Sequence, residues 1–182
     1  MEKILRLGIF VISFILVATM IQTITKNKFV ALEGNQLLSS NDVVTIRDRE
    51  RQLDCLAKNI YHEAGNEPFE GKVAVAQVTL NRAESGKFPS DVCGVIYQKN
   101  VFYEKVVCQF SWYCEGNGTG KPIRSKAMYD ESMAVAKKVL LEGFRLDIMK
   151  KAMYYHADYV NPGWKQEKIG KIGRHIFYKE SK

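Results

Sequence analysis

The sequence predicts a mainly helical α+β domain with a small region of loops and a hairpin, and three observations support this prediction. Apolar residues recur at helical spacing in three segments between Arg47 and Glu142. Residues 83–122 are instead rich in glycine, aromatic residues and cysteine, as loops and short hairpins are. A chain of 182 residues, 46% hydrophobic and 26% charged, is long enough to bury one core.

The N-terminal segment has the features of an export signal. Lys3 and Arg6 precede an apolar run from Leu7 to Ile21. A helix over this run and the three residues after it would be about 27 Å long, close to the roughly 30 Å hydrocarbon core of a bilayer. No small-x-small cleavage site follows, which favours an uncleaved anchor over a cleaved signal peptide. We therefore expect an anchor or signal peptide over residues 1–25 and a flexible linker over residues 26–47.

The globular domain is expected to span residues 48–182 and to begin with a helix that ends near Ala64. Pro68 suits the first turn of a second helix, which runs to about Arg82. The apolar residues of the first helix fall on one face: Leu53, Leu56, Ala57, Ile60 and Ala64.

The rest of the domain combines one more helix with irregular segments. A third long helix is expected from about Ser125 to Glu142, and Gly143 would end it. The stretch of residues 83–122 reads as loops with a short hairpin. The tail from Ala152 to Tyr178 alternates aromatic and polar residues.

The cysteines indicate disulfides. All four lie beyond the N-terminal segment: Cys55, Cys93, Cys108 and Cys114. In an exported domain their expected fate is oxidation, which leaves three possible pairings. A zinc site is the competing interpretation, but no Cys-x-x-Cys pair occurs. We expect two disulfides and no metal.

The charge pattern disfavours a nucleic-acid-binding protein. The formal net charge is +7, but residues 29–164 are balanced, with 17 Lys/Arg and 17 Asp/Glu. The basic excess lies in the N-terminal segment and in residues 165–182, and not on a recognition face with interleaved aromatic residues. A basic tail suits an anionic envelope polymer or a phospholipid surface.

Glu63 is the strongest candidate for a catalytic residue. It closes the apolar pattern of the first helix, immediately before the Gly65-Asn66 turn. A carboxyl group half-buried beside a core holds its proton toward neutral pH and can act as a general acid. The alternative is a solvated glutamate at a helix end. Glu67 is a candidate second carboxylate, although a helix-start carboxylate beside Pro68 is the simpler interpretation.

Metal and thiol catalysis are disfavoured. A zinc-protease motif starting at His62 needs a second histidine four residues later, where the chain has Asn66. His156 and His175 could join His62 in a three-histidine site, but single histidines among aromatic residues are more often packed in a core. A Cys–His nucleophile is disfavoured because all four cysteines can pair.

Four sequence blocks cover nearly all of residues 53–178. They contain Ile60-Tyr61-His62-Glu63-Ala64, Leu80-Asn81-Arg82, Cys108-Gln109-Phe110-Ser111 and Ile172-Gly173-Arg174-His175. In order and spacing they resemble the SleB-like cell wall hydrolases, the family of the spore-cortex-lytic enzymes. Two departures are small: the family usually has Arg-Gly at Gly65-Asn66, and Asn at Arg174.

The resemblance implies a lysozyme-like, lytic transglycosylase-like domain that cleaves peptidoglycan, with Glu63 as general acid and base and no cofactor. One glutamate suffices for a transglycosylase, because the 6-hydroxyl of the sugar can close on the anomeric carbon. The substrate-binding residues are expected among Glu67, Asn81, Gln109, Phe110, Ser111, Tyr155, His156 and His175. Some of the polar residues could instead satisfy loop backbone.

Aromatic side chains are expected to cover the apolar faces of the sugars, although most must lie in the core. The candidates are Tyr61, Phe110, Trp112, Tyr113, Tyr154, Tyr155, Trp164 and Tyr178. The expected protein is thus an exported monomer of the cell envelope that acts on peptidoglycan, contacts the membrane through its N-terminal segment and binds no nucleic acid. A hydrolytic muramidase and a non-catalytic wall-binding module are the alternatives.

Overall fold

The computed structural model describes residues 15–25, 40–115 and 120–181. The chain divides into two compact units, residues 1–46 and Arg47–Lys182. In the first unit residues 15–25 are helical, and the rest of the predicted anchor lies outside the described residues. Within the described ranges, no helix combines the length and apolar character that a membrane crossing requires.

The first helix of the domain, α2 (Ser40–Ala64), begins earlier than predicted, inside the segment expected to be a linker. The part of that linker before residue 40 lies outside the described residues. In the added turns the described side chains, residues 45–47, are exposed, and the turn that follows carries an exposed ion pair between Asp48 and Arg51 at 2.7 Å. An apolar stripe marks only the buried part of a helix, so the sequence pattern missed these exposed turns.

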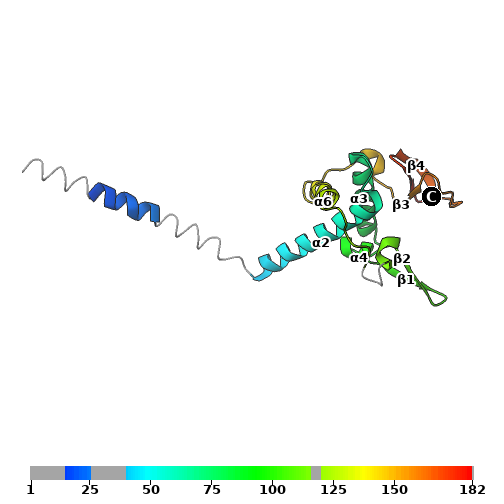
Figure 1. The fold of residues 1–182 in the computed structure, drawn as a ribbon, viewed down its shortest axis with the longest axis horizontal. Helices are drawn as coiled ribbons and strands as arrows, with labels where there is room; N and C mark the ends of the chain where they lie inside the picture. The colour runs from blue at the N-terminus through cyan, green and yellow to red at the C-terminus, as the bar shows by residue number, and fades with distance from the viewer. Residues whose placement is uncertain (1–14, 26–39, 116–119, 182) are drawn as a thin grey trace, which may run out of the picture. The chain divides into compact units, whose positions relative to one another are not determined.

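Helix α3 (Phe69–Glu84) is the central element of the domain, and most of its side chains are buried. Small residues such as Ala74 and Ala76 let its neighbours approach closely. One face of α3 packs into a core shared with α2 and α6, and the opposite face packs against Met149 and Phe177 of the C-terminal region. Figure 1 shows α3 between α6 and the C-terminal strands.

Helix α6 (Lys126–Leu140) confirms the predicted third helix, and the Oγ of Ser125 caps it by accepting a hydrogen bond from the Met128 amide. The predicted loop region contains α4 (Val92–Ile96), a hairpin and the short α5 (Ser111–Cys114). The hairpin pairs β1 (Lys99–Phe102) with β2 (Lys105–Cys108).

The tail forms a three-stranded antiparallel sheet. Its strands are β3 (Tyr154–Ala157), β4 (Glu167–Ile172) and β5 (His175–Lys179), in the order β3-β5-β4. A single 3-10 turn, η1 (Asp147–Met149), precedes β3. The aromatic and polar alternation of the tail is thus the alternation of strands with one face on the core.

Both predicted disulfides form, and the structure selects one of the three pairings. Cys55 joins Cys93 and so links α2 to α4. Cys108 joins Cys114 and so closes the segment between β2 and α5. The second disulfide brackets residues 109–111, which carry part of the candidate site.

Candidate active site

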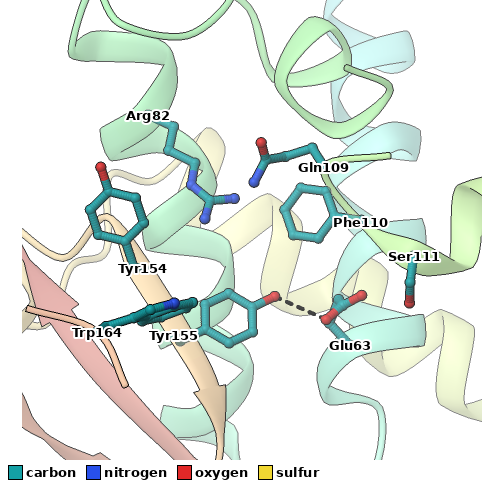
Figure 2. Close-up of a pocket in the computed structure, with 8 residues that line it drawn as sticks. All are labelled: Glu63, Arg82, Gln109, Phe110, Ser111, Tyr154, Tyr155 and Trp164. Atoms are coloured by element: carbon teal, nitrogen blue, oxygen red, sulfur yellow. Dashed lines mark hydrogen bonds between the residues drawn. The ribbon is translucent and has the colours of Figure 1, made fainter. Parts of the chain in front are cut away.

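A cavity of about 310 Å³ lies where α2, α3, the β2–α5 segment and β3 meet. Glu63 is the only carboxylate among the lining residues that the structure describes. The cavity is lined by Glu63, Arg82, Gln109, Phe110, Ser111, Tyr154, Tyr155 and Trp164. Figure 2 shows these side chains around the open space.

Glu63 lies in the last turn of α2 and is half-buried. Burial raises the pKa of its carboxyl group, because a buried charge loses its hydration. The hydrogen bond from Tyr155 and the positive charge of Arg82 oppose this shift only in part. The raised pKa keeps Glu63 protonated to a higher pH than an ordinary glutamate, as a proton donor requires.

Tyr155 on β3 donates a hydrogen bond from its hydroxyl to Oε2 of Glu63, at 3.1 Å. Burial and the neighbouring Glu63 raise the pKa of the Tyr155 hydroxyl well above its ordinary value. The hydroxyl therefore keeps its proton and remains a hydrogen-bond donor. The ring packs edge-on against His175, with centroids 5.2 Å apart, and against Phe177.

Side chains near the end of α3 hold the backbone segment that leads into β3. Nδ2 of Asn81 donates to the carbonyl oxygens of Met149 and Ala152, at 2.9 and 2.8 Å. Nε of Arg82 donates to the carbonyl oxygen of Met153, at 2.8 Å. Neighbouring polar residues on one helix thus satisfy the backbone just before β3 and set the position of that strand. Asn81 is not among the residues that line the cavity.

The segment Gln109–Ser111 is held from both ends. The disulfide between Cys108 and Cys114 closes it, and the backbone N–H of Gln109 donates to the backbone carbonyl oxygen of Gln98 at 2.9 Å. The next residue, Trp112, is buried, and its indole N–H donates to Oδ1 of Asn59 on α2 at 3.0 Å. Because Asn59 and Glu63 lie on the same helix, this bond fixes the segment relative to the candidate acid.

Glu67 has a structural position outside the cavity lining. Its Oε2 accepts a hydrogen bond from the backbone N–H of Arg174 at 2.8 Å. It therefore holds the turn between β4 and β5, at Gly173, and does not face Glu63 across the cavity. Glu67 also directly precedes Pro68, the N-cap of α3, as the helix-start interpretation expects, and its carboxylate joins this helix start to the distant turn.

The two other predicted histidines lie beside the cavity and do not line it. His156 contacts the hydroxyl of Tyr178 through Nε2 at 2.9 Å and stacks on that ring. His175 is buried against Tyr155, and burial lowers its pKa. Both histidines contribute to the packing that supports β3 and β5. No group of three or more His, Cys, Asp or Glu side chains in the described ranges is placed to hold a metal ion.

The structure therefore brings together five predicted site residues: Glu63, Gln109, Phe110, Ser111 and Tyr155. Four of the eight candidate aromatic residues line the cavity: Phe110, Tyr154, Tyr155 and Trp164. Arg82 was given no role from the sequence, although it lies in one of the four motif blocks. A charged residue in a helix rich in small and apolar residues was a possible signal, but Lys72 on the same helix shares it.

Comparison with known proteins gives matches over most of the domain. The sequence model described as Cell Wall Hydrolase matches residues 66–178. The spore cortex-lytic enzymes of Bacillus cereus and Bacillus subtilis are each 34% identical to this chain, over 137 and 129 residues. That of Oceanobacillus iheyensis is 33% identical over 133 residues.

These alignments cover 71%, 67% and 71% of this chain, but only 45%, 35% and 42% of the Bacillus cereus, Bacillus subtilis and Oceanobacillus iheyensis enzymes. The chain thus spans less than half the length of these relatives.

Two solved structures resemble the fold. The catalytic domain of the Bacillus cereus SleB protein is 27% identical with a TM-score of 0.52, covering 71% of this chain and 91% of that one. The catalytic domain of the germination-specific lytic transglycosylase SleB from Bacillus anthracis is 28% identical with a TM-score of 0.51, covering 70% and 93%. They confirm the predicted mainly helical α+β fold. The family match begins just after Glu63, so the role of that residue rests on the cavity geometry.

Proposed function

Because this chain belongs to the cell wall hydrolase family, we propose that it cleaves the glycan strands of peptidoglycan as a lytic transglycosylase. The bond cut is the β-1,4 bond between N-acetylmuramic acid and N-acetylglucosamine. The observation that carries the proposal is the half-buried Glu63, which has a raised pKa and a hydrogen bond from Tyr155, inside a cavity lined also by aromatic rings, neutral polar groups and Arg82.

In the first step, protonated Glu63 gives its proton to the glycosidic oxygen as the bond to the anomeric carbon breaks. An oxocarbenium-like centre develops on the muramoyl sugar, and Glu63 becomes a carboxylate. The Tyr155 hydroxyl stabilises this carboxylate through its hydrogen bond to Oε2. The same bond keeps the acid oriented toward the cavity.

In the second step, the Glu63 carboxylate removes the proton of the sugar's 6-hydroxyl, and that oxygen bonds to the anomeric carbon. The products are a 1,6-anhydromuramoyl end and a new N-acetylglucosamine end, and Glu63 regains its proton. No second carboxylate is needed for this sequence. This agrees with the lining of the cavity, where Glu63 is the only carboxylate among the described residues.

The remaining lining residues are proposed to bind the sugars. Gln109 and Ser111 offer neutral donors and acceptors that suit N-acetyl groups. Phe110, Tyr154 and Trp164 offer flat apolar faces that suit pyranose rings. Glu67, Asn81, His156 and His175 are proposed to act indirectly, by holding the backbone and the rings around this cavity.

We further propose that the protein is exported and works as a monomer at the cell envelope, held at the membrane by its N-terminal segment. Two observations support this: the apolar run from Leu7 to Ile21 and the pairing of all four cysteines in disulfides. Fractionation of native protein with intact-mass measurement tests it. A soluble species that starts beyond Met20 would indicate a cleaved signal peptide, and a full-length cytosolic species would contradict export.

Product analysis tests the reaction itself. Purified protein is incubated with peptidoglycan, and the released fragments are identified by mass spectrometry. Anhydromuramoyl ends are expected from a transglycosylase, whereas reducing muramic acid ends would indicate a hydrolytic muramidase. Binding to the wall without release of fragments would indicate a non-catalytic module.

A further inference from the structure

Arg82 is a buried cation in the candidate active site that forms no ion pair within the described part of the chain. It lies near the end of α3, and only 5% of the residue is exposed. Its guanidinium is within ion-pairing distance of no Asp or Glu among the residues that the structure describes. Glu63 shares the cavity with it, but burial favours the neutral form of that carboxyl group.

The contacts of Arg82 hold the side chain and leave part of its hydrogen-bonding capacity unused. Nε donates to the carbonyl oxygen of Met153 at 2.8 Å. The guanidinium carbon lies 5.3 Å from the ring centroid of Phe88 and 5.5 Å from that of Phe110. Nη1 is buried and has no hydrogen-bond partner in the described parts of the chain.

A second buried cation on the same helix shows the more usual arrangement. Lys72 is 3% exposed, and its Nζ forms an ion pair with Glu131 at 2.8 Å. Burying a charge is unfavourable unless it is paired or fully hydrogen-bonded. Arg82 lacks such a pair and lines the cavity, so a group that enters the cavity is the natural acceptor for its remaining N–H groups.

The substrate class offers a suitable group. An N-acetylmuramoyl sugar differs from N-acetylglucosamine by a lactyl side chain on its 3-oxygen, which ends in a carboxylate or, where a peptide is attached, in an amide carbonyl. Both present oxygen acceptors to a guanidinium, and a free carboxylate adds charge. Figure 2 shows the guanidinium of Arg82 and the side-chain amide of Gln109 directed toward one another. Together they can bind the carbonyl or carboxylate oxygens.

We propose that Arg82 binds the lactyl group of the muramoyl sugar and makes the cavity select muramoyl glycans over glycans built of N-acetylglucosamine alone. This inference rests on the proposed function. A purely structural Arg82, which only packs on Phe88 and Phe110, would stabilise the fold without sugar selectivity. An Arg82 that only tunes the charge of Glu63 would affect both kinds of glycan equally.

The test is equilibrium binding by calorimetry with the full-length chain carrying Glu63→Gln, which prevents turnover. The probes are a peptide-free tetrasaccharide of alternating N-acetylglucosamine and N-acetylmuramic acid, and chitotetraose, which lacks lactyl groups. The Glu63→Gln protein that keeps Arg82 should bind the muramoyl probe more tightly than chitotetraose. Adding Arg82→Met should weaken binding of the muramoyl probe about tenfold to a hundredfold, the range of a charged hydrogen bond, with chitotetraose binding nearly unchanged.

Arg82→Lys is the second variant, because it keeps the charge and the packing stem. It should retain part of the preference, since an ammonium group lacks the planar fork of the guanidinium. Lys72→Met is the matched control: it removes a buried cation from the same helix, away from the cavity, and should lower the melting temperature without changing the ratio of the two affinities.

The outcomes separate this inference from the proposed function. An unchanged preference for the muramoyl probe in folded Arg82→Met and Arg82→Lys proteins would overturn the role of Arg82 and leave glycan cleavage intact. An equal loss of affinity for both probes would show that Arg82 supports the cavity without selecting the lactyl group, which also overturns the inference. Failure of the folded Glu63→Gln protein to bind either probe would overturn the inference and the proposed function together.

Discussion

The hydroxyl of Tyr155 lies 3.1 Å from Oε2 of Glu63 and donates a hydrogen bond to it. The two residues are far apart in the sequence, at the end of α2 and in β3. Burial raises the pKa of Glu63 while this bond lowers it, and burial has the larger effect. The result is an acid that holds its proton at elevated pH and is still stabilised once the proton has left.

Tyr155→Phe should shift the pH dependence of cleavage. The hydrogen bond stabilises the carboxylate, so its loss raises the pKa of Glu63 further, and the high-pH limb of the rate profile should move to higher pH. The maximal rate should fall by about tenfold, because the carboxylate formed on proton transfer loses a charged hydrogen bond. The measurement is the rate of muropeptide release across pH.

Tyr154→Phe is the control for this shift. It removes a hydroxyl from another cavity-lining residue, one that bonds Glu180 at 3.3 Å and not Glu63. The position of its high-pH limb should match that of the unmodified protein. If the high-pH limb of the Tyr155→Phe rate profile stays in place or moves to lower pH, that result contradicts the assigned role of the hydrogen bond.

Glu63→Gln should stabilise the fold at high pH. Since the pKa of Glu63 is raised in the folded state, that state binds a proton more tightly than the unfolded chain, and stability falls as pH rises through the folded pKa. The glutamine in the variant carries no ionisable proton, so the variant does not show this fall in stability. Its free energy of unfolding relative to the parent should therefore increase from acid pH, below the unfolded pKa, toward pH 8. Urea unfolding at several pH values measures this, and a pH-independent difference would argue against the raised pKa.

Gly173→Ala should destabilise the turn between β4 and β5. Gly173 has φ of +58°, and a Cβ there would lie 1.8 Å from Oε2 of Glu67. Backbone strain and the displaced carboxylate should together lower the free energy of unfolding by about 2 to 4 kcal/mol. Gly163→Ala is the matched control, with φ of +65° and nothing within 4 Å of the added Cβ. It carries the backbone strain alone, so equal losses in urea unfolding would contradict the role assigned to Glu67.

The two disulfides should contribute unequally to stability. The sequence separation is 38 residues for Cys55 and Cys93, and 6 for Cys108 and Cys114. Loop-closure entropy gives about 4 kcal/mol for the first and about 2 kcal/mol for the second. Paired Cys→Ala variants compared by urea unfolding measure the difference. The second pair should instead affect cleavage more, because it holds Gln109–Ser111 at the cavity. The opposite ranking in both assays would contradict this division.

The sequence predicted the helical part of the domain well, because buried helix faces leave a periodic pattern. The stripe from Leu53 to Ala64 located the buried part of α2 and placed Glu63 beside the core. The start of α2 was missed because residues 45–47 are exposed and precede the buried stripe. The sheet of the tail was not predicted: β4 and β5 are joined by the short turn at Gly173, but the pairing of β3 with β5 spans an irregular loop and β4.

The candidate site could be predicted only in part. Gln109, Phe110 and Ser111 were identified from a motif, and the structure places them at the cavity. The backbone partners of Asn81 and Glu67 lie about 70 and 107 residues away in the sequence. Residue type alone therefore could not show that these side chains are already hydrogen-bonded to backbone groups. The role of Arg82 depends on the absence of a counter-charge in the described surroundings, which only the fold reveals.

The most direct test of the central claim is mass spectrometry of fragments released from peptidoglycan by the unmodified protein and by Glu63→Gln. The substitution keeps the shape of the side chain but removes its ionisable proton. The account predicts anhydromuramoyl fragments from the unmodified protein, and a rate at least about a thousandfold lower from the folded variant. Glu67→Gln should be much milder. Release by folded Glu63→Gln at the rate of the unmodified protein would contradict the assignment of Glu63 as the catalytic acid.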